Sequence, residues 1–432
     1  MRSRHSPKAS KPESPHKRQR LRDLFGPGLI TGASDDDPSG IATYSQAGAR
    51  FGYGMGWALV ATYPLMVAVQ MISARIGRTT GQGIARNIAR HYPRWLLYCI
   101  ISLLVIANTI NIGANLGAMA DATRLLFGGP PSLYVLLFAL FCALTEVFVS
   151  YKRYVRLLKW LTLALFAYVA TLFVVKIPWL EALRSIFMPQ ISLTPAYVTM
   201  VVAVLGTTIS PYLFFWQASE EAEEVNGDPK RKPLKSAPRE GPKELHRIEL
   251  DTLGGMAFSN FVALSIVFTA AATLNANGIT DIGTSAEAAE ALRPIAGDYA
   301  TIIFALGIIG TGLLAVPVLA GSAAYAAGEG AGRPVGLGRK PLAAKTFYGT
   351  IVAATLVGAA INISPVDPID ALFWAAVING VVAVPVMVMM MLMATRRDVM
   401  GKFIISGPLK WLGWVATVLM TGAVVAMGVL SL

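Results

Sequence analysis

The sequence predicts an all-α protein that crosses a membrane many times, and three observations carry this prediction. Of its 432 residues, 54% are hydrophobic and only 14% are charged, whereas an ordinary soluble domain has about 25% charged residues. The mean hydropathy is +0.55. Apolar runs of about 20 residues, the length that spans the hydrocarbon core of a bilayer, recur along the chain. This composition excludes a soluble enzyme. It also argues against a nucleic-acid partner, because the basic segments lack interleaved aromatic residues.

Eleven apolar segments have the length of a membrane helix. They cover residues 24–49, 54–74, 95–118, 131–150, 155–176, 196–222, 248–275, 298–326, 343–362, 368–395 and 408–431. We therefore expect five helices within 24–176, five more within 196–395, and an eleventh within 408–432. Residues 1–23 are basic and lack the apolar core of a signal peptide, so we expect a disordered cytosolic tail.

The distribution of Lys and Arg predicts the orientation, because cytosolic loops are rich in both residues. With the N-terminus in the cytosol, 32 of the 37 basic residues fall in the cytosolic segments 1–23, 75–94, 152–159, 230–247, 333–345 and 396–410. The other side holds only Arg50, Arg124, Lys176, Arg184 and Arg293. We expect a protein of the cytoplasmic membrane, with its N-terminus in the cytosol and its C-terminus outside.

The first apolar segment contains three consecutive carboxylates in its middle. Asp35, Asp36 and Asp37 are followed directly by Pro38. An ionised aspartate at the centre of a membrane helix costs about 2.5–3.5 kcal/mol, so these side chains must face protein or water. Proline lacks a backbone N–H and clashes with the preceding turn. The sequence therefore predicts a helix break at Pro38, next to Asp37.

The sixth segment contains a second proline, Pro211, after the polar residues Thr207, Thr208 and Ser210. A simple proline kink is the alternative to a break here. The two prolines lie five crossings apart, and because five is odd the second set of helices crosses in the opposite sense. A broken helix in each half is typical of inverted-repeat transporters whose site lies at the membrane midplane. Asp37 beside freed backbone carbonyls predicts a cation site without thiol or imidazole ligands.

At these residues the sequence resembles the Nramp family of divalent-metal transporters. The resemblance is strongest from Gly26 to Gly48 and covers the whole membrane region by helix count. It implies a LeuT-type fold, with two inverted repeats of five helices, an eleventh transmembrane helix, and helices one and six broken at mid-membrane. It also implies that the metal is bound by Asp37, the carbonyl oxygens of Ser34 and Thr207, and Ser210.

Several positions depart from the family motifs. Gly40 replaces an asparagine ligand, Ser210 replaces a methionine ligand, and Tyr212 replaces a histidine. In the third helix, Asn111 and Ala114 replace an aspartate and a glutamate of the family's proton route. Candidate auxiliary residues at the site are Asp36, Gly40, Tyr212 and Asn379. For Asn379, an interhelical hydrogen bond is the alternative.

The departures bear on the choice of ion. A thioether is a soft ligand that favours transition metals, whereas an oxygen-only site suits Mg²⁺, Mn²⁺ or Ca²⁺. In lacking the methionine, the sequence is similar to Nramp-related magnesium transporters. The missing histidine and third-helix acids leave two alternatives open. Protons move with the metal, with Asp35, Asp36 and Asp37 as the remaining acceptors, or the protein is a passive carrier.

We therefore expect a carrier of Mn²⁺ or Mg²⁺, with Fe²⁺ as a further candidate, that works by alternating access. One alternative is a LeuT-type transporter of an organic solute or amine, coupled to Na⁺ or H⁺. Another is an intramembrane enzyme that uses the Asp35–Asp37 cluster, but the sequence offers no second catalytic element, so we expect no enzyme. The expected partners are the metal ion, as substrate, and the lipid bilayer. We expect no resident cofactor, no nucleic acid and no obligatory protein partner.

Carboxylates near the predicted cytosolic face have two interpretations each. Glu220, Glu221, Glu223 and Glu224 follow the sixth helix. Pairing with the basic residues at 230–232 is favoured over an acidic vestibule that concentrates cations. Glu146, near the end of the fourth segment, is interpreted as the partner of a nearby lysine or arginine at 152–153 rather than as a ligand.

Overall fold

The computed structural model describes residues 31–32, 34–149, 163, 165–364 and 366–431. Within these residues the secondary structure is entirely helical. The expected tail at 1–23 and the basic residues at 152–159 lie outside the described part. The helices within the eleven expected segments are α2 (Pro38–Phe51), α3 (Gly56–Thr80), α5 (Arg94–Phe127), α6 (Pro131–Phe148), α8 (Phe166–Val174), α10 (Pro195–Thr208), α11 (Pro211–Gly227), α12 (Gly241–Thr273), α15 (Ala300–Gly330), α16 (Lys345–Ile361), α17 (Pro368–Ala394) and α19 (Gly407–Leu430).

Short helices connect them. The α-helical ones are α4 (Ile84–His91), α9 (Trp179–Phe187), α13 (Ser285–Glu290), α14 (Arg293–Ala296) and α18 (Arg397–Met400). The 3₁₀ turns are η2 (Gly52–Met55), η4 (Pro238–Glu240), η5 (Asn275–Asn277), η6 (Gly297–Tyr299), η7 (Pro341–Ala343) and η8 (Gly401–Phe403).

The eleven expected segments all contain helix in the described residues, but several boundaries differ. By length and composition, 8 helical stretches of the described residues could cross a membrane. The count is lower for three reasons. Residues Pro38–Thr80 form one nearly continuous stretch, α16 has only 17 residues, and part of the fifth segment lies outside the described residues.

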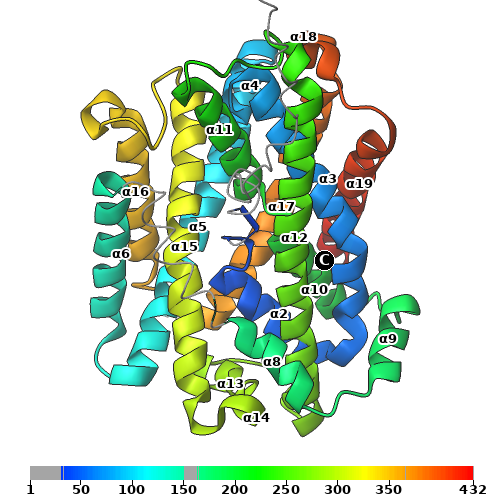
Figure 1. The fold of residues 1–432 in the computed structure, drawn as a ribbon. Helices are drawn as coiled ribbons and strands as arrows, with labels where there is room; N and C mark the ends of the chain where they lie inside the picture. The colour runs from blue at the N-terminus through cyan, green and yellow to red at the C-terminus, as the bar shows by residue number, and fades with distance from the viewer. Residues whose placement is uncertain (1–30, 33, 150–162, 164, 365, 432) are drawn as a thin grey trace, which may run out of the picture.

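Helix α2, which begins at the first predicted break, lies at the centre of the bundle. Figure 1 shows α2, in dark blue, surrounded by α12, α15 and α17. It packs chiefly against α12 and α17 and also contacts α10. By contrast, α6 and α19 lie at the periphery and bury only a few of their side chains. The predicted site is therefore enclosed, whereas the apolar outer helices face the surroundings.

Small residues allow close helix crossings near the centre. A Cβ at Gly206 of α10 would collide with the carbonyl oxygen of Ala376 in α17, and Gly380 lies directly opposite. In the same way, a Cβ at Gly77 of α3 would collide with the carbonyl of Ala218 in α11. Small residues at such contacts let membrane helices approach backbone to backbone. These crossings hold α10 and α11, the two halves of the sixth segment, against their neighbours.

The described basic segments gather at one end of the bundle, which we call the α4 end. The N–H of Leu234 donates to the carbonyl of Arg78 at 3.3 Å. The Lys235 ammonium donates to the carbonyl of Asp398 at 2.9 Å, and the Arg396 guanidinium lies 5.1 Å from the centre of the Tyr92 ring. The opposite end carries α13 and α14 (Figure 1); we call it the α13 end.

Candidate metal site

The first helix break lies at the predicted position. Helix α2 begins at Pro38, and Asp37 before it has an extended backbone, with φ −74° and ψ 169°. Its carboxylate oxygen Oδ1 accepts hydrogen bonds from the Gly40 N–H at 2.8 Å and from the Ser39 hydroxyl at 2.6 Å. Asp37 is thus the N-cap of α2, where the unpaired N–H groups and the helix dipole stabilise a negative charge. The Asp37-Pro38 pair therefore places a carboxylate at the point where the helix is interrupted.

The second break is also present, and it is more than a kink. Helix α10 ends at Thr208, Ile209 and Ser210 leave the helical conformation, and α11 begins at Pro211. The Ser210 hydroxyl donates to the carbonyls of Gly206 and Thr207, both at 2.8 Å. It therefore satisfies carbonyl groups that lost their helical partners.

Two hydrogen bonds join the two breaks. The hydroxyl of Tyr212, in the first turn of α11, donates to the carbonyl of Ser34 at 3.3 Å. On the other side, the Thr207 hydroxyl of α10 lies 3.0 Å from the hydroxyl of Tyr44 in α2. Residues more than 160 positions apart in the chain thus meet at one place. The prediction that the two interruptions lie side by side is confirmed.

Both carbonyls predicted as ligands lie at this junction. The carbonyl oxygen of Ser34 accepts from Tyr212, and that of Thr207 accepts from Ser210. A carbonyl oxygen has two lone pairs and can accept from more than one partner. The Ser210 hydroxyl, also predicted as a ligand, donates its hydrogen to the carbonyls of Gly206 and Thr207, and the lone pairs of its oxygen can still bind a cation.

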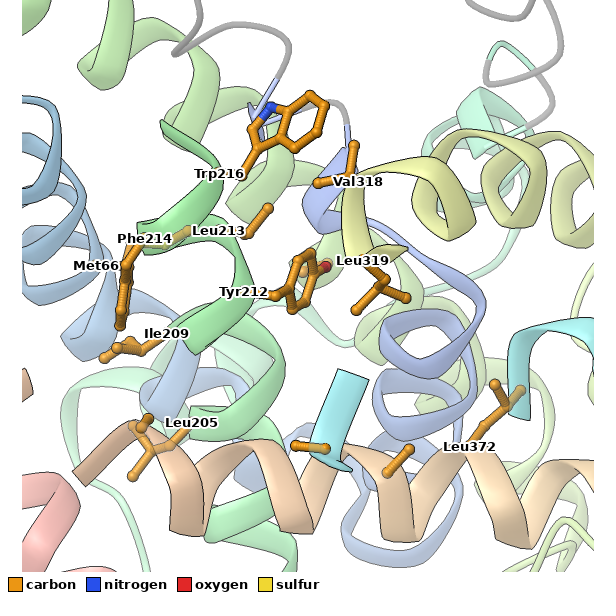
Figure 2. Close-up of a cluster of buried hydrophobic side chains, with 14 of the residues drawn as sticks. Met66, Leu205, Ile209, Tyr212, Leu213, Phe214, Trp216, Val318, Leu319 and Leu372 are labelled. Carbon is orange, nitrogen blue, oxygen red and sulfur yellow. The ribbon is translucent and has the colours of Figure 1, made fainter. Parts of the chain in front are cut away.

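Apolar side chains enclose the second break. Figure 2 shows Tyr212 in a cluster with Leu213, Leu319 and Trp216, with Leu205 and Ile209 on the α10 side. Tyr212 is 1% exposed and Asp37 is 2% exposed. The carboxylate therefore lies in a poorly solvated place, where water screens its attraction to a bound cation only weakly.

Two asparagines of α5 reach the site and were not identified from the sequence as parts of it. The Asn115 amide approaches Asp37 Oδ2 at 3.4 Å and donates to the Asn111 side-chain oxygen at 3.1 Å. Asn111, expected from the family resemblance to replace an acid, is therefore next to the site, and Ala114 is buried nearby on the same helix. The signal that could have found Asn115 is its spacing of one turn from Asn111.

The other two aspartates face α12, where sequence reasoning also missed their partner. The Ser259 hydroxyl donates to Asp35 Oδ2 at 2.6 Å and lies 3.2 Å from Asp36 Oδ1. Among the described residues, Asp35 Oδ1 and Asp36 Oδ2 have no hydrogen-bond partner. These two carboxylates thus stay available to a cation or to water.

Gly40 and Asn379, two of the candidate auxiliary residues, have contrasting surroundings. A Cβ at Gly40 would lie 3.3 Å from Tyr44 Cε2, so the Tyr44 ring occupies the space an asparagine side chain would need. Asn379 is 1% exposed, and neither polar atom of its amide has a partner among the described residues. The interhelical hydrogen bond considered for Asn379 is therefore not formed there.

The glutamates in the second half of α11 have different partners. Glu221 pairs with Arg247 at 2.6 Å and Glu224 with Arg231 at 2.8 Å. Glu223 accepts from Tyr325 and from the backbone N–H groups of Leu337 and Gly338. Glu220 accepts a hydrogen bond from the Tyr325 hydroxyl at 3.2 Å. The favoured interpretation, pairing with the basic residues at 230–232, is correct for Glu224, whereas Glu221 pairs with Arg247 of α12 instead. Lys152 and Arg153, the expected partners of Glu146, lie outside the described residues.

Two broken helices that meet beside a buried carboxylate at membrane depth are typical of inverted-repeat membrane transporters. The sequence model of the family described as Natural resistance-associated macrophage protein-like (Nramp) matches residues 28–430, and the chain belongs to this family. It is accordingly a transporter of the divalent-metal type and not an enzyme. Transporters of the Nramp family carry no cofactor, and the metal that they transport is their substrate.

Similar proteins agree with this assignment. The divalent metal cation transporter MntH of Deinococcus radiodurans is 25% identical over 415 residues, 93% of this chain and 88% of that protein. MntH of Chromohalobacter salexigens is 30% identical over 305 residues, which cover 67% of this chain and 66% of that protein.

Solved structures confirm the fold. A mutant of the Eremococcus coleocola manganese transporter matches with a TM-score of 0.75 at 17% identity, covering 95% of this chain and 87% of that one. MhsT in complex with L-phenylalanine matches with a TM-score of 0.58 at 12% identity, covering 96% and 98%. Mhp1 in its inward-facing conformation matches with a TM-score of 0.52 at 14% identity, covering 94% and 91%. The predicted LeuT-type, all-helical fold is thus confirmed.

Proposed function

We propose that this protein carries Mn²⁺ or Mg²⁺ across the cytoplasmic membrane by alternating access, with Fe²⁺ as a further candidate substrate. The observation that carries the proposal is the position of Asp37. Its carboxylate caps one half-helix at a gap, and the gap of the sixth segment is joined to the same place by Tyr212 and Thr207. A cation there meets an anionic oxygen and freed carbonyl oxygens at membrane depth.

The proposed ligands are Asp37, the carbonyls of Ser34 and Thr207, the Ser210 hydroxyl, and the Asn379 side-chain oxygen. The unpartnered amide of Asn379 supports its inclusion, because a buried polar group without a partner costs about 1–3 kcal/mol unless something binds it. Asp36 would approach through its free oxygen. All of these ligands are oxygens, so hard cations are favoured over soft ones.

Alternating access requires the contacts at the two breaks to rearrange. The bonds from Tyr212 to Ser34 and from Thr207 to Tyr44 tie half-helices of the two repeats together. We infer that one of them opens when the ion is released. We also infer that the α4 end faces the cytosol, because the described segments at that end hold most of the Lys and Arg residues.

Uptake of Mn²⁺ into proteoliposomes tests the proposal. Asp37→Asn keeps the size of the side chain and its cap to Gly40 but removes the charge, so we expect uptake to fall to the level of protein-free liposomes. Asp228→Asn, in the exposed turn after α11, is the matched control and should transport normally. Uptake by Asp37→Asn at the wild-type rate would show that the site is elsewhere. Competition by amines or amino acids, but not by Mg²⁺, would favour the organic-solute alternative.

A further inference from the structure

A groove runs along the outside of the helix bundle, between α5 and α16. Its volume is about 640 Å³. The α5 side is formed by Val105, Ile106, Thr109 and Ile110, and the α16 side by residues within 346–361. Ile106 is 58% exposed, so the groove is open toward the surroundings of the bundle. In a chain that spans a membrane, these surroundings are lipid.

The middle of the groove is apolar, although threonines contribute to its walls. The Thr109 hydroxyl donates to the carbonyl of Val105 at 2.7 Å, and the Thr350 hydroxyl donates to the carbonyl of Thr346 at 2.8 Å. These hydroxyls therefore need no partner in the groove. Gly349 also lines it, and a Cβ there would meet nothing within 4 Å. The groove thus has room for a hydrocarbon chain and suits it better than a polar ligand.

Both helices that form the groove begin at the α4 end, where α5 follows α4 and the loop before α16 binds Glu223 of α11. They touch where a Cβ at Gly113 would lie 2.7 Å from the carbonyl oxygen of Gly358. At about 1.5 Å per helical residue, Arg94 lies roughly 28 Å and Lys345 roughly 20 Å before this contact. The first residue of each helix is therefore basic, and both stand at the same end of the groove.

Helical spacing aligns these basic residues with the groove. Residues four or seven positions apart share one face of a helix, so Arg94 and Tyr98 lie on the face of α5 that carries Val105. In the same way, Lys345 lies on the face of α16 that carries Gly349. Tyr98 is 59% exposed, and tyrosine is enriched where the hydrocarbon core of a membrane meets the headgroups. The α4 end of the groove thus has the composition of a headgroup region.

Neither basic residue has an acidic partner in the part of the chain that the structure describes. Arg94 and Lys345 are both exposed, and the ion pairs formed there involve other residues. Their positive charges can therefore attract an anion from outside the chain. Basic pockets between membrane helices bind the headgroups of anionic lipids.

We propose that this groove is a binding site for an anionic phospholipid. One acyl chain lies along the groove over Gly349, and the phosphate of the headgroup lies between Arg94 and Lys345. A zwitterionic phospholipid offers the same chain but no net negative charge, so it binds less strongly. The lipid belongs to the leaflet at the α4 end, which is the cytosolic leaflet in the proposed orientation.

A second copy of the chain is the alternative occupant, because small residues such as Gly349 and Ala353 favour contacts between membrane helices. In a symmetric dimer the same surface meets itself. Arg94 and Lys345 of one copy would then approach the same residues of the other, and like charges repel. The unpaired charges at the end of the groove therefore favour an anionic lipid over a second copy.

Native mass spectrometry of the full chain tests the charge requirement. The protein is released from nanodiscs that contain equal amounts of phosphatidylglycerol and phosphatidylcholine with matched acyl chains, and the retained lipids are counted. We expect the wild type to retain phosphatidylglycerol preferentially. The double variant Arg94→Gln/Lys345→Gln should lose this preference, by about fivefold for each charge removed. Lys402→Gln/Lys410→Gln removes two other exposed charges and should retain lipid as the wild type does.

A second variant tests the groove itself. Gly349→Trp fills the groove without a clash, because a Cβ at this position meets nothing within 4 Å. We expect it to retain neither lipid. Gly422→Trp in α19 is the matched control, since Gly422 is exposed and a Cβ there also meets nothing within 4 Å. It should retain phosphatidylglycerol as the wild type does.

Thermal unfolding in detergent shows that the variants are folded and gives a second measure of binding. A ligand that binds only the folded state raises the unfolding temperature. We expect Gly349→Trp to unfold at the wild-type temperature without lipid. Added phosphatidylglycerol should raise the unfolding temperature of the wild type and of Gly422→Trp but not that of Gly349→Trp. Inorganic phosphate, which has no acyl chain, should have no such effect.

Three results would overturn the inference. The first is equal retention of the two lipids by the wild type, and the second is unchanged retention in Gly349→Trp. The third is a dimer that Gly349→Trp dissociates while no lipid is retained, which would assign the groove to a second copy. None of these measurements involves metal, so they leave the proposed function to its own test.

Discussion

Ser210 is the residue at which this chain differs most clearly in ligand chemistry from the family motif, because a hydroxyl stands where the family has a thioether. Its side chain donates to the carbonyls of Gly206 and Thr207 in the last turn of α10. The sulfur of a methionine there would be a soft ligand. The identity of this one residue should therefore set the preference between hard and soft cations.

Ser210→Met tests this point. We expect the ratio of Cd²⁺ to Mg²⁺ uptake in proteoliposomes to rise, because Cd²⁺ gains a thioether and Mg²⁺ loses an oxygen ligand. Ser192→Met, on the exposed stretch before α10, serves as the control. An unchanged ratio would remove Ser210 from the ligand set.

Asn379 offers a test that separates a ligand from a structural residue. Because its amide has no partner in the described residues, Asn379→Leu should leave the thermal unfolding temperature unchanged or raise it. The same change should weaken Mn²⁺ binding in isothermal titration. Asn362→Leu is the contrasting variant, since Asn362 donates to the carbonyl of Gly113 at 2.9 Å and its loss should lower stability. Normal Mn²⁺ affinity in Asn379→Leu would contradict the ligand role.

Gly40 stands where the family has an asparagine ligand, and we expect that Gly40→Asn alone does not restore this ligand. An asparagine here would press on the Tyr44 ring, so Gly40→Asn should destabilise the protein by about 1–3 kcal/mol, the usual cost of overpacking. Thermal unfolding in detergent measures the effect. Gly54→Asn, where a Cβ would meet nothing within 4 Å, should unfold at the wild-type temperature. Equal unfolding temperatures for the two variants would mean that Tyr44 moves aside freely.

At the scale of elements, the half-helix α11 is held by charge as well as by packing. Glu221 is fully buried and pairs with Arg247 of α12, which also contacts Glu244 at 3.3 Å. Removing one partner of a buried ion pair leaves an uncompensated charge, at a cost of about 3–5 kcal/mol. The pair therefore fixes α11 against α12 at the α4 end.

Arg247→Met should consequently lower the unfolding temperature of the detergent-solubilised protein strongly. Arg396→Met is the matched control, because Arg396 and its partner Asp398 are both well exposed and such surface pairs contribute little. A similar unfolding temperature for both variants would show that Glu221 finds another partner or is solvated.

The elements also show what sequence patterns can and cannot predict. The breaks at Pro38 and Pro211 were predictable because proline and consecutive carboxylates have strong local consequences. The start of α12 at Gly241 was not predictable, because the apolar run begins only after the charged residues 243–247. Buried ion pairs such as that of Arg247 with Glu221 let the helix include these residues. Likewise Ser259 and Asn115 reach the aspartates from distant segments, and no local pattern specifies such contacts.

At the scale of the whole molecule, the apolar segments and the position of two prolines were enough to predict an inverted-repeat transporter, and the resemblance to the Nramp family implied the LeuT-type fold. The proposed orientation rests on a charge asymmetry, because the described basic segments gather at the α4 end, with contacts such as that of Lys235 with Asp398. With Cys99 and Cys142 replaced, a single cysteine in the loop 331–340 of intact cells should resist a membrane-impermeant maleimide. A cysteine at 284, before α13, should react. The reverse pattern would invert the assigned orientation.

The central claim is that a divalent cation binds between the two helix breaks, at Asp37. The most direct measurement is the anomalous scattering of Mn²⁺ in crystals of the metal-bound protein. The account predicts a manganese peak within coordination distance, roughly 2.0–2.3 Å, of an Asp37 carboxylate oxygen, and the loss of that peak in Asp37→Asn. A peak elsewhere in the molecule, or one that persists unchanged in Asp37→Asn, would contradict it.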